Sequence, residues 1–408
     1  MSTAPATTTE TPTPGTGHVG QTFLVGEEIY LRGLESTDAK LAMSWRRTLW
    51  PVSPEATESW ISDDLVKSRD SQEFAIVRIA DDRIVGSVMV HQGGPHHWLD
   101  ATNDALLGER GLRWKGQAVA MIADWLVNER GQPVAFYQLP ADEPATIAEL
   151  ERAGMTQGAR FREMYDRNGS RVDRVTYELF GQAWIDRLGD PREMPLERTG
   201  TGEARPVPPQ VDLGTSDPPA NAMMVGSRVY LRPEDPKIDP PVSVWQARQE
   251  TETFFDIGRH LNSAVRLEGW IKDHEKGDLP SWITFTVCLR ETDEPIGWVG
   301  LIDVDYQHRF AETGSFFGHP DYRGSGYGSE AKQLLLEFAF ERLGLHMLQS
   351  WVFFANTRSA AALRKQGYTE AGRIHWAYPF NGGLDNFVAF DVLGEEWRAM
   401  PRKAWDAS

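Results

Sequence analysis

Apolar residues alternate with polar ones, or run together in short blocks, along most of the second half of the chain. These runs predict strands at residues 229–231, 283–290, 295–304, 313–318, 347–354, 373–378 and 386–392. Segments in which apolar residues recur every three or four positions predict helices at residues 242–250, 264–276, 329–343 and 357–366. Gly344 and Gly367 stand where the last two helices are expected to end. This mixture of strands and helices predicts an α/β fold.

Two segments show neither pattern. Residues 1–20 are mostly Thr, Pro, Ala and Gly, so we expect them to be disordered. Residues 190–222 are crowded with Pro and Gly, which predicts a linker between domains. Two blocks with globular composition remain, residues 21–189 and 223–408.

The two blocks resemble each other in sequence. The segment Val-Gly-x-x-Ile-Tyr-Leu-Arg at 25–32 recurs as Val-Gly-x-x-Val-Tyr-Leu-Arg at 225–232. The segment from Gly154 to Trp184 aligns without a gap on the segment from Gly367 to Trp397. The matches keep their order while the offset drifts only from 200 to 213 residues, which predicts a duplicated domain.

Composition narrows the class of protein. The chain has 408 residues, of which 40% are hydrophobic, and none of its apolar runs is long enough to predict a membrane span. Its first residues lack the basic and apolar regions of a secretory signal, and the single cysteine, Cys288, cannot form an internal disulfide. A net charge of −17 argues against general nucleic-acid binding. We therefore expect a cytoplasmic protein without a membrane or nucleic-acid partner, and leave its oligomeric state open.

A glycine-rich segment carries the most informative chemistry. It joins a predicted strand to a predicted helix and reads Arg323, Gly324, Ser325, Gly326, Tyr327, Gly328 and Ser329. Free N–H groups at the start of a helix, with glycines that permit close approach, can cradle an anion such as a phosphate. A turn that needs a positive φ explains the glycines equally well. The spacing matches neither the dinucleotide-binding fingerprint nor a Walker A loop.

At these residues the chain resembles the GNAT superfamily of acyl-CoA-dependent N-acyltransferases. The pyrophosphate loop of that family, Arg/Gln-x-x-Gly-x-Gly/Ala, is matched by Arg323, Gly326 and Gly328. The segment Ala-Glu-Thr-Gly-Ser-Phe-Phe at 311–317 and the motif Asn356-x-x-Ser359 are similar to the ribosomal-protein alanine N-acetyltransferase branch. The resemblance extends over nearly all of residues 223–400 and is weaker in the first block.

The resemblance implies two tandem GNAT domains, each a mixed, mostly antiparallel sheet flanked by helices. Strands at about 312–318 and 348–355 would splay apart, and the pantetheine arm of acetyl-CoA, the implied cosubstrate, would lie between them. The backbone groups of Phe316 and Phe317 would pair with pantetheine. The loop 323–329 would hold the pyrophosphate, and Asn356 would reach the arm near the thioester. No metal is implied.

Acetyl transfer to an amine has two proton steps. The amine must lose a proton before it attacks the thioester, and the leaving thiolate is released more easily beside a donor. The tyrosine donor common in the superfamily corresponds here to Leu363. The resemblance therefore implies that Ser359 is the donor and that Glu312 is the base or holds a water. Two alternatives remain open, that Ser359 only caps or packs its helix and that Glu312 is a solvated edge residue.

Asp303 and Asp305 alternate along a predicted strand, so we expect them to share one face. Two carboxylates on one face could bind a cationic amine, although solvated carboxylates are the commoner reason for such a pattern.

The first block keeps the loop pattern as Arg113-x-x-Gly116-x-Ala118 but differs at the other aligned positions. Asn356, Glu312 and Ser359 align there with Glu143, Thr102 and Thr146. We therefore expect a degenerate domain that shapes the acceptor site or the assembly, and an active second block.

The predicted function is transfer of an acetyl group from acetyl-CoA to a primary amine by direct attack. The acceptor would be a peptide or protein N-terminus, or a small amine such as an antibiotic. The alternative is a non-catalytic acyl-CoA-binding or scaffolding module.

Overall fold

The computed structural model describes residues 22–46, 48, 50–68, 71–91, 97–193, 219–235, 239, 265, 268, 269, 272, 279–318, 320–380 and 383–400. The predicted disordered N-terminus, most of the predicted linker and the helix expected at 242–250 lie outside these residues, as does most of the helix expected at 264–276. None of the described helices is long and apolar enough to cross a membrane.

The chain forms two compact units that do not follow the sequence in a simple way. One unit consists of Met1–Gly158, Val175–Met194 and Trp376–Pro379, and the other of Ala159–Arg174, Pro195–His375 and Phe380–Ser408. Each half of the sequence therefore gives a short segment to the unit built by the other half. The domain boundaries at 21–189 and 223–408 remain a prediction from the repeat.

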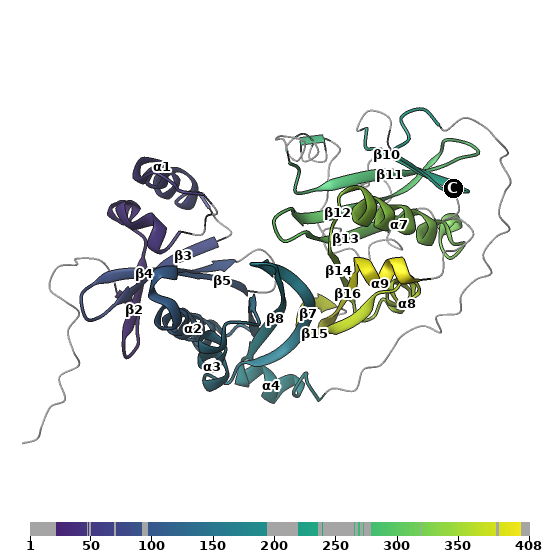
Figure 1. Cartoon of the computed structure of the whole chain (residues 1–408). Coiled ribbons are helices and arrows are strands. Elements are labelled where there is room, and N and C mark those ends of the chain that lie inside the picture. Colours follow the sequence, from purple (N-terminus) through teal and green to yellow (C-terminus); the bar gives the residue numbers. More distant parts are fainter. Residues whose placement is uncertain are drawn as a thin grey trace, which may run out of the picture. The chain divides into compact units, whose positions relative to one another are not determined.

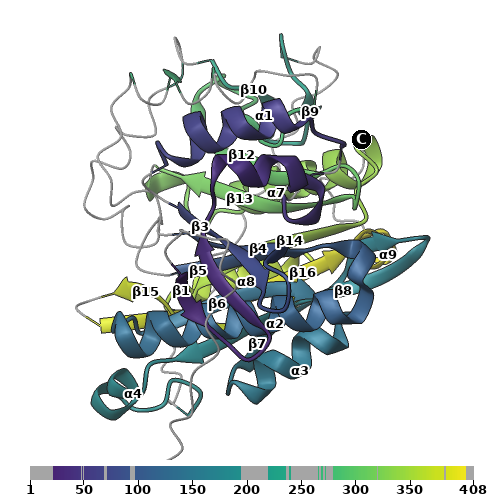
Figure 2. The ribbon, with the colours of Figure 1, turned by 90° about the vertical axis from the view of Figure 1, so that its left-hand side faces the viewer.

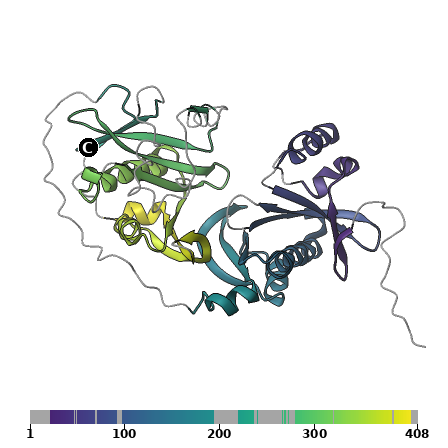
Figure 3. The same cartoon turned by 180° about the vertical axis from the view of Figure 1, so that it is seen from behind.

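The first half contains a mixed sheet with helices on both faces (Figures 1 and 3). The strand order is β1-β2-β3-β4-β5-β6-β8-β7. The strands are β1 (Thr22–Val25), β2 (Ile29–Gly33), β3 (Ser71–Arg78), β4 (Arg83–His91), β5 (His97–Asn103), β6 (Val134–Pro140), β7 (Thr156–Arg167) and β8 (Ser170–Phe180). The helices are α1 (Pro54–Ser59), α2 (Gly108–Asp124), α3 (Pro144–Arg152) and α4 (Gln182–Leu188). Among these strands, β5 and β6 pair in parallel, and β1 to β5 pair with one another antiparallel.

The second half repeats this arrangement. Its strand order is β9-β10-β11-β12-β13-β14-β16-β15, and β13 and β14 are the parallel pair. The strands are β9 (Met224–Val225), β10 (Val229–Pro233), β11 (Ile283–Leu289), β12 (Pro295–Asp305), β13 (Phe310–Phe317), β14 (Met347–Phe353), β15 (Thr369–Phe380) and β16 (Gly383–Leu393). The helices are α7 (Tyr327–Glu337), α8 (Thr357–Lys365) and α9 (Gly394–Ala399). These elements confirm the predicted strands and the two predicted helices that the structure describes.

The apolar stripe of α7 explains why this helix lies against the sheet. Ala331, Leu334 and Leu335 are buried in one core with Val229, Val299 and other strand residues. Burial of each such leucine contributes about 1.5–3 kcal/mol to stability. The stripe therefore fixes which side of α7 faces β13, and with it the direction in which the start of the helix points.

The two halves have the same unusual backbone conformation at equivalent positions. Asp82 and Asp293 both have a positive φ, of 54° and 59°, in equivalent turns. Glu163 and Trp376, which are 213 positions apart in the sequence, have φ values of 51° and 52°. Residues other than glycine rarely adopt this conformation, so its recurrence at matched positions points to a common origin of the two halves. The expected pair of tandem domains with a common α/β fold is confirmed.

Candidate functional site

The parallel strands β13 and β14 pair over only three positions. Phe310, Ala311 and Glu312 lie opposite Met347, Leu348 and Gln349, and no later pair is formed between the described residues of these strands. The two strands therefore separate after Glu312 and Gln349, as the resemblance to the GNAT superfamily implies. On its other edge β13 stays paired with β12 as far as Phe317. The edge that faces β14 beyond Glu312 is thus free of a strand ladder, which is the arrangement that an added extended chain requires.

Glu312 lies at the last paired position before the strands separate. Burial, and secondly the charge of Asp303, raise the pKa of the Glu312 carboxyl to about 7. The cations of Arg174 and Lys332 and a hydrogen bond from Gln349 act in the opposite direction. The Nε2 of Gln349 donates to Oε2 of Glu312 over 3.3 Å. A carboxyl with a pKa near 7 can accept and release a proton at neutral pH.

Lys332 is a charged neighbour of Glu312 that the sequence did not single out. It lies in α7, four residues after Gly328, and its side chain is buried. Burial lowers the pKa of Lys332 to about 7, while the charge of Glu312 acts to raise it. A lysine within an otherwise apolar helix face is the signal that could have identified it.

Asp303 and Asp305 have different surroundings and different roles. Asp303 has a φ of 50°, and the pairing of β12 with β13 becomes irregular between Ile302 and Asp305. The Asp305 carboxylate accepts a hydrogen bond from the backbone N–H of His308 over 2.7 Å. Asp303 therefore affects the charge of Glu312, whereas Asp305 stabilises the turn between the strands.

The glycine-rich loop forms the start of α7. Gly324 and Gly326 have φ values of 75° and 88°, and Gly326 is the residue before the first helical turn. Both positions need the left-handed conformation that glycine adopts without strain. The turn interpretation of these glycines is therefore correct, and it is compatible with an anion cradle at the helix start.

A buried ion pair holds this loop. The Nε of Arg228 donates to Oε2 of Glu330 over 2.8 Å, and its Nη1 donates to the carbonyl oxygen of Ser325 over 3.1 Å. The guanidinium also lies over the ring of Tyr327, 4.7 Å from its centre. These contacts of Arg228 hold both the loop and the first turn of α7 in place.

Arg323 joins the loop to the end of β13. Its Nε donates to the carbonyl oxygen of Phe317 over 2.7 Å, and its Nη2 donates to that of Gly318 over 3.3 Å. The first turn of α7 also contacts this strand end, because a Cβ added at Gly328 would lie 3.0 Å from the Phe317 ring. Arg323 thus holds the loop against Phe317, in addition to its expected role toward a phosphate.

Asn356 and Ser359 lie together at the start of α8. The Asn356 side-chain oxygen accepts a hydrogen bond from the backbone N–H of Ser359 over 3.2 Å and so caps the helix. Because Asn356 supplies the cap, the Ser359 hydroxyl is not used for it. Leu363 is buried in the core under the same helix, as expected for an apolar replacement of a tyrosine.

Comparison with known proteins agrees with this geometry. Residues 228–369 match the model of the acetyltransferase (GNAT) domain family. The second half of this chain is a GNAT domain. The match confirms the resemblance seen in the sequence.

Curated relatives are also acetyltransferases. The uncharacterized N-acetyltransferase p20 of Bacillus licheniformis is 30% identical over 113 residues, or 28% of this chain and 63% of that protein. Spermidine N(1)-acetyltransferase of Escherichia coli (strain K12) is 26% identical over 106 residues, or 26% and 56%. The putative ribosomal N-acetyltransferase YdaF of Bacillus subtilis (strain 168) is 28% identical over 101 residues, or 25% and 55%. The chain therefore spans less than two thirds of the length of each of these three proteins.

The first half lacks the loop that its sequence pattern suggested. Arg113, Gly116 and Ala118 all lie inside α2, which already begins at Gly108, so the expectation of a retained loop is wrong. Gly116 allows α2 to pack against α3 (Figure 2), because an added Cβ would lie 2.8 Å from the carbonyl oxygen of Thr146. Gly116 therefore serves the packing of these two helices.

Strand register also corrects the sequence alignment of the two halves. Asn103 lies opposite Gly86, as Phe317 lies opposite Gly297, and from these positions Trp98, not Thr102, is the counterpart of Glu312. Trp98 pairs with Phe136 just as Glu312 pairs with Gln349. The two rings stack with their centres 4.9 Å apart. The first half therefore has an apolar pair where the second half has a carboxyl and an amide.

Proposed function

We propose that the second half of this protein transfers an acetyl group from acetyl-CoA to a primary amine. The observation that carries the proposal is the position of Glu312, a carboxyl whose pKa is raised to about 7 at the point where β13 and β14 separate. In a GNAT domain the thioester lies near this point. A base with a pKa close to the working pH is the kind of group that acetyl transfer to an amine needs.

The residues at the site fit acetyl-CoA. Among the described residues the ladder between β13 and β14 ends at Glu312 and Gln349, before Phe316 and Phe317, which suits backbone pairing of β13 with the amides of pantetheine. The loop from Arg323 to Ser329 leads into a helix start, which suits the pyrophosphate. The side-chain oxygen of Asn356 caps α8, so its NH₂ group is the part that would reach the arm.

Glu312 would act on the acceptor. Its carboxylate accepts a proton from the ammonium group, directly or through a water, and the neutral amine then attacks the thioester carbon. A C–N bond forms, the C–S bond breaks, and the second proton of the nitrogen passes, directly or through a water, to the Ser359 oxygen as that hydroxyl gives up its own proton. The Ser359 hydroxyl donates to the leaving sulfur, so the products are the amide and CoA. Placing the two reactants side by side would contribute about 7–11 kcal/mol of the barrier reduction, more than either proton step.

The acceptor is proposed at the level of a primary amine. The names of two relatives mention spermidine and the ribosome, so a small amine and a protein N-terminus are both supported as acceptor classes. Asp303 and Glu312 bring two carboxyl groups to the site, Arg174 brings a guanidinium, and Lys332 brings an amine whose pKa is lowered to about 7. Because acidic and basic groups are both present at the site, its charge does not favour a polycation over other primary amines.

A panel of acceptors tests the proposal. The purified full chain would be mixed with acetyl-CoA and spermidine, a peptide with a free N-terminal amine, or an aminoglycoside, while CoA release is followed. Mass spectrometry would identify the acetylated product. We expect release with at least one acceptor, and a fall of roughly 100-fold or more in Glu312→Gln. Acetyl-CoA binding without release in the presence of any acceptor would favour the non-catalytic alternative.

A further inference from the structure

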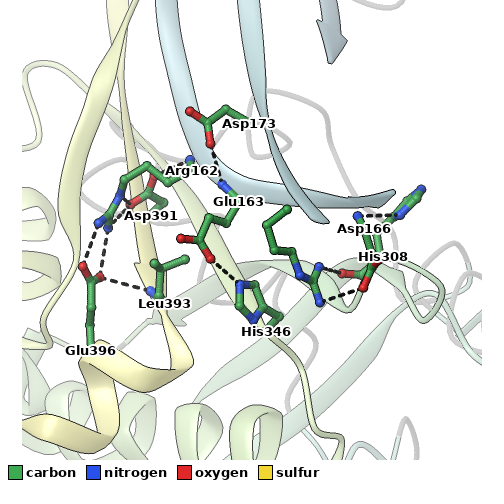
Figure 4. A network of polar contacts seen from close by, with 10 residues as sticks. Arg162, Glu163, Asp166, Asp173, His308, His346, Asp391, Leu393 and Glu396 are labelled. Carbon is green, nitrogen blue, oxygen red and sulfur yellow. Dashed lines mark hydrogen bonds and ion pairs between the residues drawn. The ribbon is translucent and has the colours of Figure 1, made fainter. Parts of the chain in front are cut away.

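The tip of the β7–β8 hairpin, residues 159–174, comes from the first half of the sequence but belongs to the compact unit of the second half. Ion pairs anchor it there (Figure 4). Arg162 donates to Asp391 over 2.6 Å and to Glu396 over 2.7 Å, and the Nε2 of His346 lies 2.8 Å from Oε2 of Glu163. The hairpin tip is thus an integral part of the unit that holds the GNAT site.

Arg174 is the last residue of this hairpin tip, and its side chain is buried. Its Nη2 donates to Oε1 of Gln349 over 2.5 Å. Its guanidinium lies 4.6 Å from the centre of the Phe161 ring, which in turn packs edge-on against Trp351 with the centres 4.8 Å apart. Arg174 is therefore held in one place by a stacked ring and by a charge-assisted hydrogen bond.

This hydrogen bond determines how Gln349 acts on Glu312. A guanidinium can only donate, so the group of Gln349 that it contacts must be the amide oxygen. The NH₂ group of Gln349 then points to Oε2 of Glu312, 3.3 Å away. Arg174, Gln349 and Glu312 thus form a chain of two hydrogen bonds. The Arg174 guanidinium donates to the amide oxygen of Gln349, and the NH₂ group of Gln349 donates to the Glu312 carboxyl.

Several groups face Glu312 from the surrounding elements. Asp303 lies on β12 and carries a carboxyl group, whereas Arg174 on β8 carries a guanidinium and Lys332 on α7 carries an amine whose pKa is lowered to about 7. Tyr368, which precedes β15, is also close to Glu312. Burial and the charge of Glu312 raise the pKa of its hydroxyl, which forms a hydrogen bond with the hydroxyl of Thr313. Removal of Arg174 would take away the permanently charged cation near the Glu312 carboxyl, leaving Asp303 and Lys332 beside it, and would free Gln349 to turn. Both changes favour the protonated form.

We propose that Arg174 is a positioning residue of the acetyl-transfer site, which through Gln349 orients the Glu312 carboxyl and keeps it ionised. The first half of the chain thus completes the site of the second half, even though its own fold replaces the CoA loop by a helix. The proposal rests on the proposed function in one respect, that Glu312 takes the proton of the acceptor.

The pH dependence of kcat/KM tests this role. In Arg174→Gln we expect the acid limb to move to higher pH, so that activity at the acid end falls about tenfold for each pH unit by which the limb moves. Arg174→Lys should restore part of the lost activity. The matched control is Arg162→Gln, which removes a cation from the same hairpin that contacts Asp391 and Glu396 but not Glu312. An unmoved limb in Arg174→Gln, or an equal movement in Arg162→Gln, would overturn the proposal.

A second measurement separates this inference from the proposed function. The Glu312 carboxyl carbon can be followed by ¹³C NMR in the full chain and assigned by its absence in Glu312→Gln. Its titration midpoint should rise in Arg174→Gln and stay at the wild-type value in Arg162→Gln. If no amine is acetylated but the midpoint rises as expected, only the proposed function fails. If amines are acetylated and the midpoint does not move, only the role of Arg174 fails.

Discussion

The Nζ of Lys115 lies 2.5 Å from Oε2 of Glu143, and both side chains are buried in the first half of the chain. Glu143 aligns with Asn356, the residue expected to reach the thioester in the second half. A lysine of α2 therefore faces a carboxylate at the position that aligns with Asn356. This buried pair supports the proposal that the first half is a degenerate domain without an acetyl-CoA site.

This ion pair gives the first prediction. Lys115→Met removes the cation that faces Glu143 and should destabilise the first unit by about 3–5 kcal/mol, because a buried carboxylate loses its partner charge. Lys115→Met combined with Glu143→Leu should recover most of the loss. Urea unfolding of the three proteins measures both effects. Equal stability of the single variant and the wild type would show that the pair is unimportant to the fold.

Gly326 gives a prediction about acetyl-CoA. Gly326→Asp places a carboxylate at the helix start and should abolish binding. In the wild type, ligand at about 100 times its Kd should stabilise the fold by about 2.7 kcal/mol. Gly344→Asp is the control, because Gly344 also has a positive φ, of 65°, has no atom within 4 Å of an added Cβ, and follows the far end of the same helical segment. In thermal unfolding, acetyl-CoA should stabilise the Gly344→Asp variant but not the Gly326→Asp variant. Stabilisation of Gly326→Asp would contradict the loop assignment.

Asp303 gives a prediction with a definite sign. Its charge helps to raise the pKa of Glu312 to about 7, so Asp303→Asn should lower that pKa. The base then stays ionised to lower pH, and the acid limb of kcat/KM should move down, opposite to the movement expected for Arg174→Gln. Asparagine tolerates the positive φ at this position. A pH–rate profile measures the position of the limb, and an upward movement would mean that Asp303 does not face the catalytic carboxyl.

Asn356 and Ser359 can be separated by three variants. Asn356→Asp keeps an oxygen for the helix cap and removes the NH₂ donor, so acetyl-CoA affinity should fall while stability stays near the wild type. Asn356→Ala should lose affinity and, in addition, about 1 kcal/mol of stability from the lost cap. Ser359→Ala should lower kcat by up to roughly 100-fold with little change in acetyl-CoA binding. Steady-state kinetics and calorimetry distinguish these effects, and unchanged kcat in Ser359→Ala would remove the serine from the mechanism.

Much of the second half could be predicted from its sequence. Alternating apolar residues identify its strands, the stripe through Ala331 and Leu335 identifies the buried face of α7, and Gly344 and Gly367 end helical segments with φ values of 65° and 94°. These are local rules, in which side-chain period and backbone freedom act within a few residues. The resemblance of short motifs to the GNAT superfamily then pointed to Glu312, Asn356 and Ser359 as site residues, and their roles stay a prediction.

The remainder depends on contacts between distant segments. The pattern Arg113-x-x-Gly116-x-Ala118 matches a loop motif, yet it is helical because α2 begins eight residues before Gly116 and packs on α3. The alignment of Thr102 with Glu312 was wrong because it ignored strand pairing, which puts Trp98 opposite Phe136. Arg174 belongs to neither motif, and only the placement of its hairpin brings its charge to Gln349. Sequence patterns within one block cannot reveal a residue that acts in the other.

The central claim is that one acetyl-CoA site, built in the second half, carries out acetyl transfer for the whole chain. Calorimetric titration of the full chain with acetyl-CoA tests it most directly. We expect one site per chain in the wild type, one site in Gly344→Asp and no binding in Gly326→Asp, with acetyl transfer lost in Gly326→Asp alone. Two equivalent sites per chain, or acetyl transfer that survives Gly326→Asp, would contradict this account and assign an active site to the first half.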